Sequence, residues 1–247
     1  MKNVNDSYFD GYYKEIWRTV IPDELTVREI DFIVPFFDLK PGSKVLDLMC
    51  GYGRHTLSLA RKGIHVNAID NLPDYIQEIE KISKEEDLPV KLQQTDVLSF
   101  KTDEKFDLAI CMGNSLNFFN SKDIVNLFET ISACLKPGGQ LLINSWSLAE
   151  TVFKNFREKA WSNIGDLKFL TDSSFLFHPS RIETTTTIID PDNRSEIKIA
   201  IDYIYSVNEM EDMLMKSGFI LKEIYSIPGK KKFTLGEPRA YIIAQKS

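Results

Sequence analysis

The sequence has few cysteines, few histidines and no long apolar run. Three cysteines and three histidines are spread over 247 residues, which is too sparse for a disulfide framework, and none cluster with metal-ligand spacing. No apolar run approaches the roughly 18 residues that a membrane-spanning helix needs, and the first residues lack the apolar centre of a secretory signal. We therefore expect a cytoplasmic protein without metal or membrane anchor.

Positive charge is also scarce. The chain has 30 lysines and arginines against 36 aspartates and glutamates, a formal net charge of −6 at pH 7. The single basic run, Lys230 to Lys232, lies beside a Pro-Gly turn, as a solvated loop would. Nucleic-acid binding draws on a basic surface. The composition thus argues against a nucleic-acid partner, and we expect a small-molecule substrate bound by a monomer or a homodimer.

What the sequence does contain is a regular alternation of strand-like and helical patterns. Apolar runs predict strands over 44–48, 64–70, 90–97, 105–113 and 140–146, with amphipathic helices between them. A capped helix over 206–218 then precedes two more strands, 220–227 and 239–246. Such alternation is typical of crossover units that build a parallel sheet covered on both faces.

Two further segments flank or interrupt this alternation. Residues 7–20 place aromatic and apolar side chains at helical spacing, and a second helix is predicted over about 24–38. Residues 148–164 predict one more helix, and β-branched runs on both sides of the turn 190–194 predict a β-hairpin. We expect one domain over 1–247: a helical lid (about 1–38), a core (about 39–146 and 206–247) and an inserted cover (about 147–205).

The turn after the first strand is built to lie against a ligand. Gly51 and Gly53 allow positive φ and a close approach of the main chain. Aspartates end three successive strands: Asp47, Asp70 and Asp96. A carboxylate at Asp70 can accept both hydroxyls of a ribose, and one at Asp96 can accept an adenine amine. These positions predict an adenosine lying along the sheet edge.

The identity of the adenosine ligand follows partly from exclusions. NAD sites use G-x-G-x-x-G, and the third glycine position is Thr56 here. No Gly-Lys-Ser/Thr follows the turn, so a phosphate-binding loop is also excluded. Asp47 would repel a pyrophosphate but would suit a ligand that carries an amino group and a sulfonium.

The segment VLDLMCGYGRHTLSLA (45–60) resembles the first motif of class I S-adenosylmethionine-dependent methyltransferases, whose pattern is acid-x-Gly-x-Gly-x-Gly. VNAIDNL, QQTDVLSF, FDLAICMGNSLNFF and LKPGGQLLINSW resemble the motifs that follow, in order and at normal spacing. The resemblance covers about residues 40–146. It implies a Rossmann-like α/β fold with a doubly wound, mostly parallel seven-stranded sheet and an antiparallel last strand, to which the inserted α+β-hairpin cover is added.

The resemblance also implies an activity and a cofactor. It implies methyl transfer from S-adenosyl-L-methionine by in-line displacement, with S-adenosyl-L-homocysteine as the product. We expect a small-molecule acceptor. The alternatives are transfer to RNA or protein, or a non-catalytic S-adenosylmethionine-binding protein.

Roles for individual residues follow from the resemblance. It implies that Asp47 lies near the methionine amino group, that Asp70 binds the ribose hydroxyls and that Asp96 receives the adenine amine. The further cofactor-binding residues that it implies are Cys50, Gly51, Tyr52 and Gly53 in the turn, Asn71 and Leu72 beside the adenine, Val97 on the ring, and Met112 and Gly113 near the methionine part. The family's first glycine is Met49 here, so we expect an ordinary L-residue backbone at that position.

Candidates on the acceptor side are less defined, because in-line displacement needs alignment more than a general base. The candidates form two sets. The catalytic candidates are Tyr13, His55, Asn117 and His178, and the substrate-binding candidates are Tyr12, Trp17, Arg54, Asn114 and Arg181. Each has a structural alternative: the aromatic stripe can pack on the core, the asparagines can cap a loop, and a histidine at a helix start or a His-Pro turn can serve the fold alone.

Overall fold

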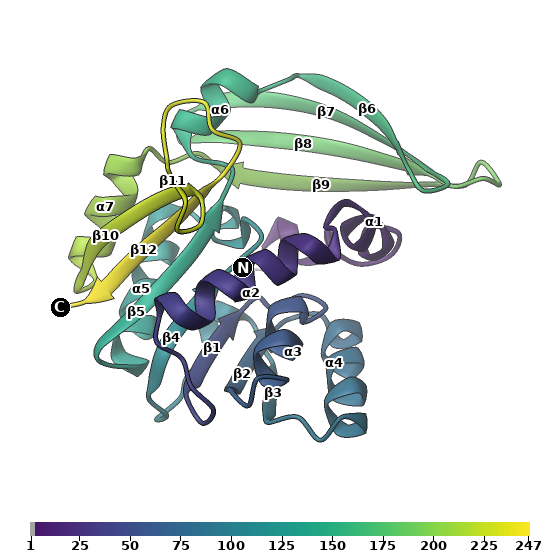
Figure 1. Cartoon of the computed structure of the whole chain (residues 1–247). Helices are drawn as coiled ribbons and strands as arrows, with labels where there is room; N and C mark the ends of the chain where they lie inside the picture. Colours follow the sequence, from purple (N-terminus) through teal and green to yellow (C-terminus); the bar gives the residue numbers. More distant parts are fainter. Residues whose placement is uncertain (1–2) are drawn as a thin grey trace.

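A mostly parallel sheet forms the centre of the computed structural model, which describes residues 3–247 (Figure 1). Its strand order is β11-β10-β12-β5-β4-β1-β2-β3. The strands are β1 (Lys44–Leu48), β2 (His65–Asp70), β3 (Val90–Gln94), β4 (Phe106–Cys111), β5 (Leu135–Ser145), β10 (Phe219–Ile227), β11 (Lys231–Lys232) and β12 (Ala240–Lys246). The chain starts at β1, moves to β3 on one side and returns through β4 on the other, so the sheet is doubly wound.

The direction of the strands confirms the predicted fold class. The pairs β1–β2, β1–β4, β2–β3 and β4–β5 are parallel, whereas β12 runs antiparallel to both β5 and β10. The two-residue strand β11, antiparallel to β10 at the sheet edge, is added to the seven predicted strands. The carboxyl ends of β1, β2, β3 and β4 therefore meet at one edge, with the reversal of strand order between β1 and β4.

Helices cover both faces of this sheet. They are α2 (Asp23–Phe36), α3 (Arg54–Ala60), α4 (Pro73–Glu85), α5 (Ser121–Cys134) and α7 (Val207–Lys216). Neighbouring residues of β1 point to opposite faces: Val45 joins a core with Ile33 and Leu59 of α2 and α3, and Leu46 joins one with Phe128 of α5. Burial on both faces is the reason why these strands are continuously apolar in sequence.

The N-terminal segment, residues 3–20, differs from the single helix predicted over 7–20. A 3-10 turn, η1 (Val4–Ser7), comes first, and α1 (Tyr13–Val20) forms only the second half. Gly11 at φ +61° lies in the left-handed region and separates the two. Ile16 of α1 packs against Leu167 and Ile188 of the inserted segment, so the apolar stripe is buried mainly by the insertion.

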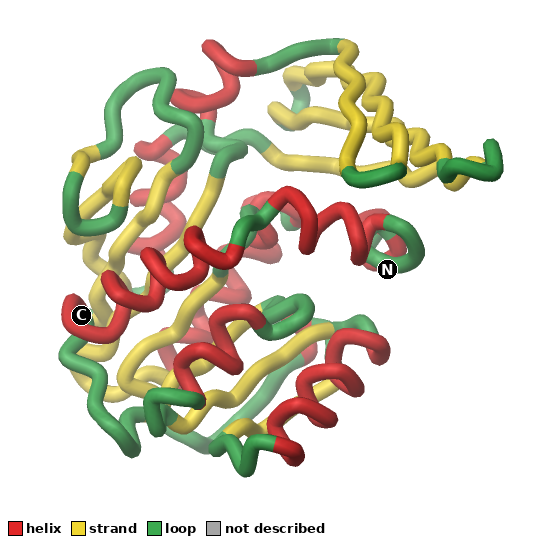
Figure 2. Tube along the Cα trace, turned by 45° about the vertical axis from the view of Figure 1, so that its right-hand side comes forward, coloured by secondary structure: helices red, strands yellow, loops and turns green. Residues whose placement is uncertain are grey.

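The insertion is larger in strand content than the predicted hairpin. After α6 (Ala149–Asn155), it forms a four-stranded antiparallel sheet of β6 (Lys159–Ile164), β7 (Leu167–Phe177), β8 (Ser180–Ile189) and β9 (Ser195–Tyr203). We call it the cover sheet; Figure 2 shows it beside the central sheet rather than extending it. The predicted hairpin is β8–β9, and the prediction of a helix through residue 164 is wrong after Asn155. A two-residue Gly165–Asp166 loop joins β6 to β7, and this hairpin signal was missed.

Side-chain hydrogen bonds join the N-terminal segment to the cover sheet. Asn5 exchanges two bonds with the main chain of Ile201, at 2.8 and 3.0 Å. The Tyr12 hydroxyl donates to Asp190 at 2.7 Å, and the hydroxyls of Tyr8 and Thr186 are 2.9 Å apart. These bonds join the N-terminal segment to the cover sheet, although the bonded residues are about 180 positions apart in sequence. None of the helices within residues 3–247 is long and apolar enough to cross a membrane.

Candidate functional site

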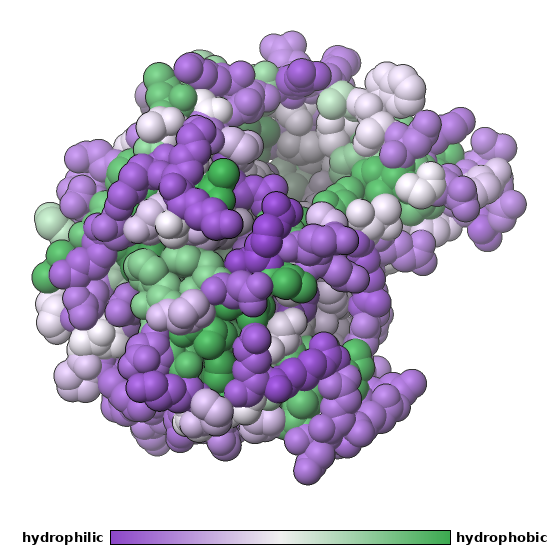
Figure 3. Space-filling view, in the orientation of Figure 1, coloured by the Kyte–Doolittle hydropathy of each residue, from purple (hydrophilic) through white to green (hydrophobic). Residues whose placement is uncertain are grey.

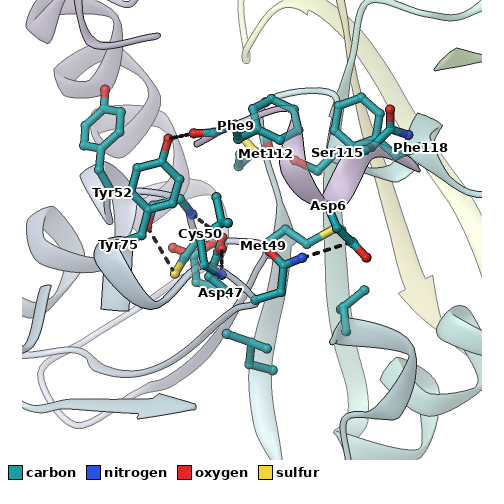
Figure 4. Close-up of a pocket in the computed structure, with 18 of the residues that line it drawn as sticks. Asp6, Phe9, Asp47, Met49, Cys50, Tyr52, Tyr75, Met112, Ser115 and Phe118 are labelled. Atoms are coloured by element: carbon teal, nitrogen blue, oxygen red, sulfur yellow. Dashed lines mark hydrogen bonds between the residues drawn. The ribbon is translucent and has the colours of Figure 1, made fainter. Parts of the chain in front are cut away.

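A cavity with about 970 Å³ of free space, partly open to solvent, lies at the carboxyl ends of β1, β2, β3 and β4. We call it the strand-end cavity. Ligand sites of open α/β sheets occur at this edge, beside the reversal of strand order. Figure 4 shows Phe9 and Phe118 on one side of it and Asp47 and Cys50 on the other.

The floor of the cavity is the turn after β1. Gly51 and Gly53 have φ of +55° and +78°. A Cβ added to Gly51 would meet no atom within 4 Å, whereas one added to Gly53 would lie 2.6 Å from Cγ1 of Ile79. Gly51 thus leaves the cavity open, and Gly53 allows α4 to pack against the turn.

The backbone of Met49 does not follow our expectation. Its φ is +54°, in the left-handed region and not in an ordinary L-residue region. The neighbouring hydrogen bonds explain this conformation: the amide of Cys50 donates to the carbonyl of Ile69 at 3.0 Å, and the amide of Gly51 donates to Asp70 at 2.8 Å. The turn is held against β2 at a cost of about 1 kcal/mol for a left-handed non-glycine residue.

Asp70 is fixed by the main chain around it. Its Oδ2 accepts the amide of Gly51 at 2.8 Å, and its Oδ1 accepts the amide of Leu72 at 2.9 Å. The side chain is buried, and burial raises its pKa against the lowering effect of these amides. Each oxygen keeps a further lone pair, because a carboxylate oxygen can accept two bonds. Asp70 can therefore accept two neighbouring hydroxyl groups.

Asp47 lies deeper in the cavity wall. It is 2 % exposed, and Thr56 donates from Oγ1 to its Oδ2 at 2.6 Å. Burial raises the pKa of Asp47, and His55, Thr56 and Arg54 oppose that rise. The threonine at the third glycine position of the dinucleotide fingerprint is therefore a partner of the carboxylate, a role that glycine could not fill.

Asp96 and Asn71 lie at the opposite end of the cavity. Asp96 is exposed and accepts the amide of Leu98 at 3.0 Å, and the neighbouring Val97 is buried. The side-chain amide of Asn71 donates to Asp6 at 3.0 Å, which brings η1 against this end. With the exception of Gly53, every predicted cofactor-binding residue lines the cavity: Asp47, Cys50, Gly51, Tyr52, Asp70, Asn71, Leu72, Asp96, Val97, Met112 and Gly113.

Three of the acceptor-side candidates also line the cavity: Trp17, Arg54 and His55. The charge of Arg54 is engaged, because it donates to Glu29 at 2.5 Å and to Thr26 at 3.0 Å. His55 lies 2.9 Å from the same carboxylate oxygen of Glu29, and Tyr241 donates to the other at 2.7 Å. Burial alone would raise the pKa of Glu29, but His55, Arg54 and Tyr241 lower it to about 2.

The remaining candidates do not line the cavity. Tyr13 packs between Tyr8, Phe9 and Trp17. The other five are engaged elsewhere: Tyr12 bonds Asp190, Asn114 bonds Ser147 and Asp202, Asn117 bonds the carbonyl of Tyr203, His178 precedes a cis proline between β7 and β8, and Arg181 pairs with Glu183. Asn114 and Asn117 thus join the loop after β4 to the cover sheet.

The predicted lid, about 1–38, contains residues that line the cavity but were not named as site residues from the sequence. Asn3, Asn5, Asp6 and Phe9 all line it, and the hydroxyl of Tyr75 donates to the carbonyl of Phe9 at 3.1 Å. Their sequence carries no spacing signal, because η1 is a single turn. The aromatic composition of residues 8–17 was the available hint that this segment covers something.

Comparison with known proteins gives these observations a family context. A family model described as a methyltransferase domain matches residues 45–139. The chain is 27% identical over 225 residues to YqeM of Bacillus subtilis (strain 168), provisionally named as a methyltransferase, with 83% of this chain and 84% of YqeM covered.

Two solved structures share the fold over almost the whole chain. An S-adenosylmethionine-dependent methyltransferase from Clostridium acetobutylicum ATCC 824 has a TM-score of 0.80 at 19% identity, covering 95% of this chain and 96% of that one. CalS10 from Micromonospora echinaspora, an amino pentose methyltransferase solved with S-adenosylmethionine bound, has a TM-score of 0.73 at 17% identity, covering 96% and 98%. At these identities the likeness establishes a common fold.

Proposed function

We propose that the chain is a class I S-adenosylmethionine-dependent methyltransferase and that its methyl acceptor is a small molecule held between the strand-end cavity and the cover sheet. The methyltransferase-domain model matches residues 45–139, and we infer S-adenosylmethionine as the cofactor from this match and from the fold shared with CalS10. The observation that carries the proposal is the position of the cavity, which the N-terminal segment lines while its residue Asn5 bonds Ile201 of the cover sheet.

The residues present fit this cofactor. Asp70 has two oxygens free to accept one further hydrogen bond each, which matches the two ribose hydroxyls. Gly51 leaves open space where any side chain would intrude. We propose that Asp70 binds the ribose, that Asp96 and Val97 hold the adenine with Asn71 and Leu72, and that Asp47, Met112 and Gly113 surround the methionine part.

S-adenosylmethionine supplies the methyl group on a sulfonium, so the chain must align the acceptor and exclude water. Trp17 and Phe9 line the cavity from the N-terminal segment, and Gly113 lies against Trp17, with the ring 3.4 Å from where its Cβ would be. We propose that residues 1–38 act as a lid on the core formed by 39–146 and 206–247. Residues 147–205 then act as the cover over the acceptor.

Three observations favour a small acceptor over RNA or protein. The cavity is bounded by the N-terminal segment, whose contacts leave room for a compact ligand. The net charge of −6 gives no general attraction to a polyanion. CalS10, which shares the fold through the cover region, is by its description an amino pentose methyltransferase, and this supports an acceptor of similar size.

The proposal is tested by measuring S-adenosylhomocysteine release in a screen of a metabolite library against RNA and protein extracts. We expect turnover with at least one small molecule. Release that occurs only with RNA or protein would contradict the proposal, and cofactor binding without turnover of any acceptor would favour a non-catalytic binding protein.

A further inference from the structure

A carboxylate that sequence reasoning did not single out belongs to the cover sheet and bonds to the core. Asp202 is on β9, and its Oδ1 accepts hydrogen bonds from Asn114 Nδ2 at 2.8 Å and from Ser147 Oγ at 3.3 Å. Asn114 directly follows Gly113 of the cavity lining. Asp202 is therefore one side chain away from the strand-end cavity, on the acceptor side proposed above.

The second oxygen of Asp202 is free. No hydrogen bond within residues 3–247 reaches its Oδ2. Thr151 Oγ1 is the one fully buried side-chain polar atom in that range without a partner, so Oδ2 is in contact with open space. Because the bonds to Oδ1 fix the carboxylate and no donor reaches Oδ2, Oδ2 can accept a hydrogen bond from a ligand N–H.

The side chain of Asp202 is half-buried. Burial raises its pKa to about 6 against the hydrogen bonds of Ser147 and Asn114. Figure 3 shows a hollow between the cover sheet and the core.

A row of aromatic rings begins at Trp17, which lines the strand-end cavity. Tyr13 and Trp17 are stacked with ring centres 6.3 Å apart, and the rings of Trp17 and Trp146 are 5.8 Å apart. The main-chain amide of Trp146 donates to Asn114 at 2.9 Å, and Asn114 in turn bonds Asp202. All three rings are half-buried. Aromatic faces attract cations, and the attraction grows when the site is desolvated.

We propose that Asp202 binds the methyl acceptor and that this acceptor is an amine. A free carboxylate oxygen beside aromatic faces recognises an ammonium group by charge, hydrogen bond and cation–π contact together. A neutral alcohol would gain only the hydrogen bond. The inference rests on the proposed small-molecule acceptor and narrows it to one class of nucleophile.

The transfer step balances with Asp202 as the proton acceptor. The ammonium form R–NH₃⁺ gives a proton to Oδ2, which leaves a free lone pair on nitrogen and a neutral carboxylic acid. The nitrogen attacks the methyl carbon; the N–C bond forms while the C–S bond breaks and leaves its electron pair on sulfur. The products are R–NH₂⁺–CH₃ and S-adenosylhomocysteine, and the Asp202 proton passes to solvent.

The test uses paired probes and a conservative variant of the full chain. Primary amines are each matched with their hydroxyl analogue, such as glucosamine with glucose and phenethylamine with 2-phenylethanol, and S-adenosylhomocysteine release is measured. We expect turnover of amines alone. D202N keeps Oδ1 as an acceptor for Asn114 and Ser147, so it should bind S-adenosylhomocysteine as the wild type does while kcat/KM falls roughly 100-fold or more.

The matched control and the pH profile separate recognition from a purely structural role. D172N removes a carboxylate from β7 that is paired with the exposed Lys159, and it should leave kcat/KM unchanged. In the wild type kcat/KM should fall as the pH drops through about 6, because Asp202 must be ionised. D202N should lose this limb. The other titratable groups that face Asp202 are the hydroxyls of Tyr8 and Tyr13, and burial raises both their pKa values, so they stay neutral there.

The outcomes distinguish the two proposals. Turnover of the hydroxyl series, or full amine activity in D202N, would overturn the amine inference and leave the small-molecule function intact. Binding of S-adenosylhomocysteine without turnover of either series would contradict the small-molecule function and the amine site together.

Discussion

At the scale of single residues, the turn after β1 separates two uses of glycine. Gly51 faces open space in the cavity, whereas Gly53 faces the side chain of Ile79. Both have positive φ, so an alanine at either position carries left-handed strain of about 1 kcal/mol. Only at Gly53 is a packing clash added.

These two glycines give a matched pair of variants. We expect G51A to lower the free energy of unfolding by about 1 kcal/mol and to weaken S-adenosylhomocysteine binding, because its methyl group enters the cavity. G53A should destabilise by about 2–4 kcal/mol from strain and overpacking. Urea unfolding and calorimetry measure both quantities. Equal destabilisation by the two variants would contradict the packing explanation.

Some site residues could be predicted from the sequence and others could not. Asp47, Asp70 and Asp96 could be predicted because each ends a recognisable strand. The free oxygen of Asp202 could not, since its partners Asn114 and Ser147 are 88 and 55 residues away. Asn114 and Asn117 were noticed for their place after β4, but the loop-capping alternative describes their observed contacts better.

At the scale of elements, one buried ion network joins α2, α3 and β12. Glu29 of α2 is 1 % exposed and accepts from Arg54, His55 and Tyr241. No local sequence pattern predicts this network, because Glu29 and Tyr241 are 212 residues apart. The network fixes α3, and with it the cavity lining at Arg54 and His55, against the helix that precedes β1.

The network predicts a pH dependence of stability. The pKa of Glu29 in the folded chain is about 2, below its ordinary 4.5. A depressed carboxyl pKa contributes stability that is present above pH 4.5 and is lost as the pH falls toward 2, about 3 kcal/mol in all for a shift of this size. Urea unfolding at pH 7 and at pH 3 should show about 2 kcal/mol of this loss in the wild type, because pH 3 lies between the two pKa values.

The variant E29Q should remove that contribution. It leaves Arg54 and His55 buried without their counter-charge, so we expect a loss of about 3 kcal/mol at pH 7 and a smaller further loss on acidification. E86Q, at the more exposed Arg61–Glu86 pair, should leave the free energy of unfolding nearly unchanged, because solvent screens an exposed ion pair. A similar effect of both substitutions would show that the Glu29 network contributes no more to the free energy of unfolding than an exposed ion pair does.

Elements also differ in how well the sequence predicted them. The parallel strands were found because burial on both faces makes them continuously apolar. In β7 apolar and polar side chains are mixed, as in Leu170, Thr171 and Asp172, so no strand was predicted there. The helix predicted over 148–164 extended past Asn155, where α6 ends. The break at Gly11 was missed because the spacing of aromatic residues continues across it.

At the scale of the whole molecule, the N-terminal segment is held by contacts from three directions. It bonds to β9 and the β8–β9 turn through Asn5 and Tyr12, to the loop after β2 and to α4 through Asp6 and Phe9, and to the segment after β4 through Asn3. It therefore closes a cavity whose floor belongs to the core. A ligand in that cavity should hold the segment in place.

Hydrogen exchange can measure this closure. Saturating S-adenosylhomocysteine should slow exchange in residues 5–20 at least about tenfold, since binding stabilises the closed arrangement by mass action. The loop 228–238, which lies outside the cavity lining, serves as the internal control and should not change. Protection that is equal in both segments, or absent from residues 5–20, would count against the lid.

The placement of the adenosine is tested most directly by a calorimetric double-mutant cycle, which combines variants of Asp70 with removal of the ribose hydroxyl from the ligand. The wild type should bind S-adenosylhomocysteine at least roughly tenfold more tightly than its 2′-deoxyribose analogue, because a buried acceptor is left unpaired. D70A should lose that preference, whereas D74A, which removes the same charge at an exposed site nearby, should keep it. An undiminished preference for the ribose in D70A would contradict the placement of the adenosine at the ends of these strands.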